Sequence, residues 1–137
     1  MRQYFLAVAI FTASVITLKV NAQTRIGFSE SDIRYKEFPD KEFKSGTLKE
    51  GEKYISWSTE KIICTYVFDS TNICSWCAIQ PKNQGSLNYY VEEFNRIYVI
   101  IDDTHWKWYS DKGIIKITLS FPKEADGYNT FFFDKIK

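Results

Sequence analysis

Histidine, methionine, proline and cysteine are scarce in this sequence of 137 residues. It contains one histidine, one methionine, three prolines and three cysteines. Any histidine-dependent catalysis must therefore use His105, whereas a zinc site normally takes three or four ligands. The sequence also contains no phosphate-binding glycine loop and no nucleophile elbow. We predict no catalytic residue, no metal site and no cofactor, and we expect a protein that is not an enzyme.

An excess of charge of one sign is also missing. The chain has 18 basic and 17 acidic residues. Removal of residues 1–22 takes away Arg2 and Lys19 and no acidic residue, which leaves 16 basic against 17 acidic residues and a net charge of −1. A nucleic-acid-binding domain usually carries a basic excess. The balance therefore argues against a nucleic-acid partner.

The long apolar run of the sequence lies at its N-terminus. Arg2 precedes a stretch of apolar and small residues from Tyr4 to Leu18. The segment Val20-Asn21-Ala22 then has small residues where a signal peptidase cleaves. This pattern is typical of a secretory signal peptide. A membrane anchor needs about 20 apolar residues, and Lys19 interrupts this run too early. We predict a signal peptide at residues 1–22 and a single secreted domain at residues 23–137, in the periplasm or outside the cell, that is not an integral membrane protein after cleavage.

The rest of the chain alternates between helix and strand signals. Ser29 is a predicted N-cap, with Asp32 three residues on and Pro39 ending the helix. Ser86 is predicted to cap a second helix, whose apolar residues from Leu87 recur at helical spacing. Predicted strands cover residues 53–58, 61–68, 73–79, 98–101, 105–110, 114–121 and 129–133, with a short edge strand at 47–48.

Both halves of this order begin with a helix and continue with three or four strands. A repeated α-β-β-β unit of this kind predicts an α+β two-layer sandwich, in which one curved antiparallel sheet carries two helices on one face. The pattern formed by Gly27, Ser29, Asp32 and Ile33, followed by three strands, resembles the repeats of β-lactamase-inhibitor-like and outer-membrane-assembly lipoprotein domains. The composition also resembles that of small secreted proteins of Bacteroidota. The first resemblance implies binding to another protein.

The cysteines allow two interpretations. If residues 69–72 form a two- or four-residue turn, Cys64 lies opposite Cys77, and a disulfide between them becomes possible in an oxidising compartment. The alternative is a pair of reduced thiols in the core. The motif from Cys74 to Cys77 has the spacing of a thiol oxidoreductase, but it falls in a strand, where no helix N-terminus lowers the thiol pKa.

The aromatic residues, 18% of the chain, supply the remaining candidates. Trp106 and Trp108 share one face of a strand, and they either fill the core or present a surface to a glycan or protein. Asp102, Asp103 and His105 form a polar loop beside them, with a structural or solvent-facing His105 as the plainer interpretation. We predict a module that binds an envelope or extracellular protein, with a glycan-binding accessory protein or a thiol oxidoreductase as alternatives.

Overall fold

The computed structural model describes residues 24–124 and 127–136. The predicted signal peptide at residues 1–22 lies outside these residues. In chain order the elements are α2 (Glu30–Asp32), the π-helical turn η1 (Ile33–Glu37), β1 (Lys44–Thr47), β2 (Lys53–Ser58), β3 (Ile62–Phe68), β4 (Cys74–Pro81), α3 (Gln84–Ile97), β5 (Val99–Asp102), β6 (His105–Ser110), β7 (Gly113–Ser120) and β8 (Thr130–Lys135).

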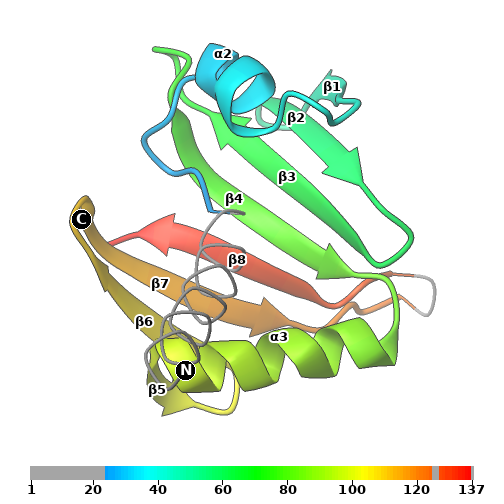
Figure 1. Ribbon diagram of the computed structural model, residues 1–137, viewed down its shortest axis with the longest axis vertical. Coiled ribbons are helices and arrows are strands. Elements are labelled where there is room, and N and C mark those ends of the chain that lie inside the picture. The colour runs from blue at the N-terminus through cyan, green and yellow to red at the C-terminus, as the bar shows by residue number, and fades with distance from the viewer. Residues whose placement is uncertain (1–23, 125–126, 137) are drawn as a thin grey trace, which may run out of the picture.

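All eight strands form one antiparallel sheet with the order β1-β2-β3-β4-β8-β7-β6-β5. Each half of the sheet is a four-stranded meander that follows a helical segment, and the two halves join where β4 pairs with β8 (Figure 1). This join leaves the first strand of each meander, β1 and β5, at the two edges of the sheet. The predicted α+β class with an antiparallel sheet is confirmed.

The first helical segment has the predicted ends, but most of it is a π-turn and not an α-helix. Ser29 is the N-cap, as expected, and its hydroxyl accepts a hydrogen bond from the backbone N–H of Asp32 at 3.1 Å. After one α-helical turn the chain widens into the π-turn, and the N–H of Phe38 bonds to the carbonyl of Ile33. A single π-turn of this kind accommodates one extra residue in a helix. It ends at Phe38, just before Pro39.

The second helix, α3, begins earlier than predicted. The side-chain oxygen of Asn83 accepts a hydrogen bond from the N–H of Ser86 at 2.8 Å, so Asn83 is the N-cap and Ser86 lies inside the first turn. Asparagine is as good an N-cap as serine, and the extended backbone at Asn83 lets it take this role. The predicted apolar face is present, with Leu87, Tyr90 and Phe94 buried.

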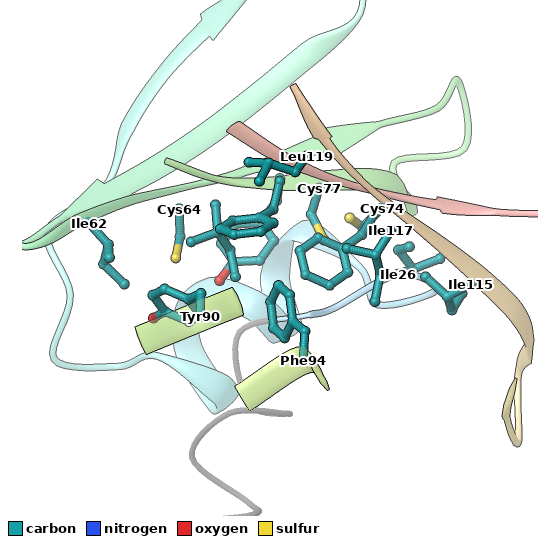
Figure 2. Packing of buried hydrophobic residues seen from close by; sticks show 14 of the residues in the cluster. Ile26, Ile62, Cys64, Cys74, Cys77, Tyr90, Phe94, Ile115, Ile117 and Leu119 are labelled. Carbon is teal, nitrogen blue, oxygen red and sulfur yellow. The ribbon is translucent and has the colours of Figure 1, made fainter. Parts of the chain in front are cut away.

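Both helical segments pack on the same face of the sheet. Phe38, after η1, makes ring contacts with Trp57 and Tyr66 on β2 and β3. Phe94 of α3 makes ring contacts with Trp106, Phe131 and Phe133 on β6 and β8. Figure 2 shows Tyr90 and Phe94 of α3 below sheet residues that include Cys77, Ile117 and Leu119. This face holds a continuous core that spans both halves of the sheet.

Candidate functional site

The β5 strand is an apolar edge of the sheet. Val99, Ile100 and Ile101 have exposed fractions of 49%, 54% and 52%, so all three side chains are half in solvent. Among the described residues no strand lies beyond β5. An edge strand presents backbone N–H and C=O groups that can pair with another extended chain. We call these three residues, with the outer backbone of β5, the β5 edge.

The opposite edge is built differently. β1 has the sequence Lys44-Ser45-Gly46-Thr47, which carries no apolar side chain. Tyr54 of the neighbouring strand lies against Gly46, since a Cβ atom there would fall 2.7 Å from the Tyr54 hydroxyl oxygen. An edge lysine is a device that discourages strand pairing, and β5, which has the same length of four residues, contains no lysine. The two edges therefore differ in their capacity to bind a further strand.

A tight turn follows β5 and contains three of the residues that the sequence singled out. Oδ1 of Asp102 accepts a hydrogen bond from the N–H of Thr104 at 2.9 Å, and it lies 2.8 Å from Nδ1 of His105. The Thr104 N–H, followed by His105, lowers the pKa of Asp102. Asp103 occupies the turn itself and is exposed. These contacts of Asp102 with Thr104 and His105 stabilise the turn, which lies at the end of the β5 edge.

This turn does not form a metal site. No group of three or more histidine, cysteine, aspartate or glutamate side chains in residues 24–124 and 127–136 is arranged to hold a metal ion. The Thr104 hydroxyl lies 3.0 Å from the same His105 nitrogen that faces Asp102, so it does not extend the pair into a relay. The acidic turn thus contributes charge beside the β5 edge.

Trp106 is not a surface residue. It is 1% exposed, and its indole N–H donates to Oδ1 of Asn95 on α3 at 2.8 Å. The suggestion that Trp106 binds a partner directly is therefore wrong, and the alternative of a core tryptophan holds. The β6 strand turns both Trp106 and Trp108 toward the helices, because residues two apart in a strand share a face. The predicted shared face is present, but it points inward.

Trp108 lies farther along that face and borders a pocket. The pocket has a volume of about 400 Å³, and its walls include Ile26, Phe28, Trp108 and Ile115. Charged side chains also line it: Arg25, Glu37, Asp111 and Lys112. Nε of Arg25 lies 2.8 Å from Oε1 of Glu37, and Nζ of Lys112 lies 3.9 Å from the centre of the Phe28 ring. A half-buried Trp108 can therefore meet a small ligand here.

The predicted pairing of Cys64 with Cys77 is wrong. Cys64 lies opposite Ile79, while Cys77 lies opposite Tyr66. The loop before β4 has five residues, because Phe68 pairs with Cys74, and its fold is held by the Asp69 carboxylate and by Asn72 in the left-handed region. A further irregularity in the register follows between Val67 and Phe68. The longer loop and this irregularity together shift the pairing of β3 with β4 by two residues from the predicted register. All three cysteines are free thiols.

The same irregularity changes the thiol motif. Two residues three apart in a regular strand point to opposite faces, but Ser75 is an extra residue here, and both Cys74 and Cys77 are buried in the core. Burial raises the pKa of Cys74 to about 12, and it raises the pKa of Cys64 and Cys77 as well. A reactive thiol needs the opposite shift. These surroundings favour thiols that pack and do not react.

The sequence reasoning missed the two surfaces that the fold creates. It identified residues 98–101 as a β-branched strand but did not place that strand at an edge. The position of β5 as the first strand of the second meander was the available signal. The sequence reasoning also missed one side of the pocket, which is lined by Arg25, Phe28 and Lys112. Part of this side forms only because the segment before α2 docks on the start of β4, where the N–H of Gly27 donates to the carbonyl of Cys74 at 2.8 Å.

A search of family models, of curated proteins and of solved structures found no match to this chain. Within the described part of the chain, no helix has the length and apolar character needed to cross a membrane.

Proposed function

We propose that this chain is a non-enzymatic, secreted or periplasmic protein-binding module that works by strand addition at the β5 edge. Its partner is an envelope or extracellular protein that supplies an extended segment. In this mode the backbone hydrogen bonds provide much of the affinity, and alternate side chains provide the specificity. The observation that carries the proposal is the half-exposure of Val99, Ile100 and Ile101 on a strand with a free outer side.

The contrast between the two edges supports this assignment. Three consecutive exposed β-branched residues favour pairing, and natural proteins usually interrupt such a strand with lysine or proline. The β1 edge has that protection in Lys44, whereas residues 99–101 contain no charge. The support for secretion is separate: it comes from the sequence of residues 1–22.

Site-specific photocrosslinking tests the proposal. A photoreactive amino acid replaces Ile101 in one variant and Ser45, on the β1 edge, in a matched control, and each variant is produced in its native compartment. Both positions are exposed, so neither change disturbs the core. We expect a discrete protein adduct from position 101 and none from position 45. Equal labelling at the two positions, or no adduct from position 101, would contradict strand addition.

We also propose that the two halves are copies of one unit and that the whole is a two-layer sandwich. The support is the repeated order of a helical segment followed by a four-stranded meander, with the copies joined at β4 and β8. The resemblance to β-lactamase-inhibitor-like and outer-membrane-assembly lipoprotein repeats points to the same protein-binding role. The resemblance to small secreted Bacteroidota proteins agrees with the proposed compartment.

A second candidate function is binding of a small saccharide at Trp108. The observation that favours it is the pocket of about 400 Å³, in which Trp108 and Phe28 offer aromatic walls and Glu37 and Arg25 offer polar groups. Titration with a panel of mono- and disaccharides, followed by tryptophan fluorescence, tests it. We expect a saturable change that Trp108→Ala abolishes and Ile100→Lys leaves intact. A flat titration with every sugar would remove this candidate.

A further inference from the structure

The β5 edge has opposite charges at its two ends. Asp102 and Asp103 follow the apolar residues, and both are exposed. Arg96, at the end of α3, precedes them; about half of its side chain is exposed, and its guanidinium pairs with the Glu93 carboxylate of the same helix. Lys107 on β6 lies opposite Val99, at the same end as Arg96. The strand therefore runs from a basic end, through an uncharged centre, to an acidic end.

From this arrangement we propose that the partner of the β5 edge is a second copy of this chain, paired antiparallel through β5. This inference rests on the proposed function and names the occupant of the same edge. A twofold axis at Ile100 sets Ile100 opposite its copy and Val99 opposite Ile101 of the second copy, the residue at which the register between β5 and β6 is irregular. Apolar side chains then meet at every central position. The acidic end of each strand meets the basic end of the other.

The topology also favours a closed pair over a longer assembly. An isologous contact uses the same patch on both copies, and it closes after two. After β5 pairs with β5, the outer edges of the joined sheet are the two β1 strands, whose polar residues discourage further pairing. The β5 contact is short, four residues per copy. Stable complexes bury about 1,200 Å² or more, and a contact of four residues per copy predicts a weaker dimer that forms only at higher concentration.

Sedimentation velocity of the purified chain over a range of concentrations tests this proposal. We expect the mass to rise from one chain toward two as the concentration increases. Ile100→Lys places a charge at the twofold axis and should weaken self-association by at least about tenfold. Ser45→Lys, the matched change on the β1 edge, should leave it unchanged. A monomer at every concentration, or an association that Ile100→Lys does not weaken, overturns self-pairing.

A charge exchange tests the antiparallel direction. Asp103 is chosen because Asp102 holds the turn. Arg96 is chosen because half of its side chain is exposed, and its pair with Glu93 is lost equally in the single and the double variant. Asp103→Lys alone and Arg96→Glu alone should each weaken the dimer, and the double variant should restore it, since each end then meets an opposite charge again. Loss of association that the double variant does not restore overturns the antiparallel arrangement. Unchanged unfolding midpoints in all variants establish that the fold is retained.

The two proposals fail in different ways. A chain that is monomeric at every concentration, but whose position 101 crosslinks to a different protein, overturns self-pairing and leaves strand addition in place. A chain that forms no adduct from position 101 and no dimer overturns both.

Discussion

The indole N–H of Trp106 donates a hydrogen bond to Oδ1 of Asn95 at 2.8 Å, and this bond joins β6 to α3. Trp106 is buried, whereas Asn95 is exposed to solvent on α3. The bond therefore fixes α3 over the half of the sheet that ends in the β5 edge. It also explains why a tryptophan, with its polar N–H, can be fully covered at this position.

Loss of the Asn95 side chain should leave that indole N–H without its acceptor. We expect Asn95→Ala to lower the free energy of unfolding by about 1–3 kcal/mol, measured by urea denaturation. Asn88→Ala is the control, because Asn88 is exposed on the same helix and its side chain accepts a hydrogen bond from exposed Gln84. Both changes share the gain in helix propensity. Equal stabilities for the two variants would show that the bond contributes nothing.

Thiol titration tests the state of the cysteines. Cys64, Cys74 and Cys77 are buried and free, so protein unfolded without reductant should react with three equivalents of a thiol reagent. The folded protein should react slowly, because burial raises the pKa of all three thiols. A single reactive thiol in the unfolded chain would instead establish a disulfide and contradict the register described above.

Alkaline pH should destabilise the fold through the same thiols. In the unfolded chain a cysteine thiol has a pKa of about 8.5. In the folded chain burial raises the pKa of each of the three thiols. Above that pH the unfolded state has lost protons that the folded state keeps, so stability falls as pH rises. Each thiol should contribute about 1.4 kcal/mol per pH unit.

Urea denaturation from about pH 8 to about pH 10 measures this slope, since the thiols of the unfolded chain titrate across that range. The variant Cys64→Ala removes one thiol. The fall of its free energy of unfolding with pH should therefore be smaller by about 1.4 kcal/mol per pH unit, even though its stability at neutral pH is also lower. An identical slope in the variant would mean that Cys64 is ionised to the same extent in both states.

The stretches with regular periodicity could be predicted from the sequence. The strands at residues 53–58 and 105–110 have the predicted ends, and the apolar face of α3 is as expected. These features depend on local pattern. The register between β3 and β4 could not be derived in the same way, because it depends on a five-residue loop and on one extra residue at Ser75.

The same limit applies to the candidate site. Alternation showed that Trp106 and Trp108 share a face, but the side of the sheet on which the helices pack decides whether that face is buried. The β5 run looks like a core strand by composition, and its exposure follows from the pairing of β4 with β8, which leaves β5 outermost. The residues that pair between β4 and β8 are more than fifty positions apart, and a local sequence pattern does not predict such a contact.

Matched substitutions of isoleucine should separate the edge from the core. Ile100 is 54% exposed and Ile117 is fully buried beneath α3. We expect Ile117→Ala to lower the free energy of unfolding by about 2–5 kcal/mol and Ile100→Ala to change it by less than about 0.5 kcal/mol. Urea denaturation in dilute solution gives both values. A large loss for Ile100→Ala would mean that this residue is there to hold the fold and not to meet a partner.

The central claim is that β5 is the edge through which this protein pairs with another chain. Amide hydrogen exchange tests it most directly, by comparing residues 98–104 and 43–48 in the dilute purified chain and in the complex recovered from its native compartment. We predict that exchange in residues 98–104 slows in the complex while exchange in residues 43–48 is unchanged. Equal exchange of residues 98–104 in the two samples would contradict the claim.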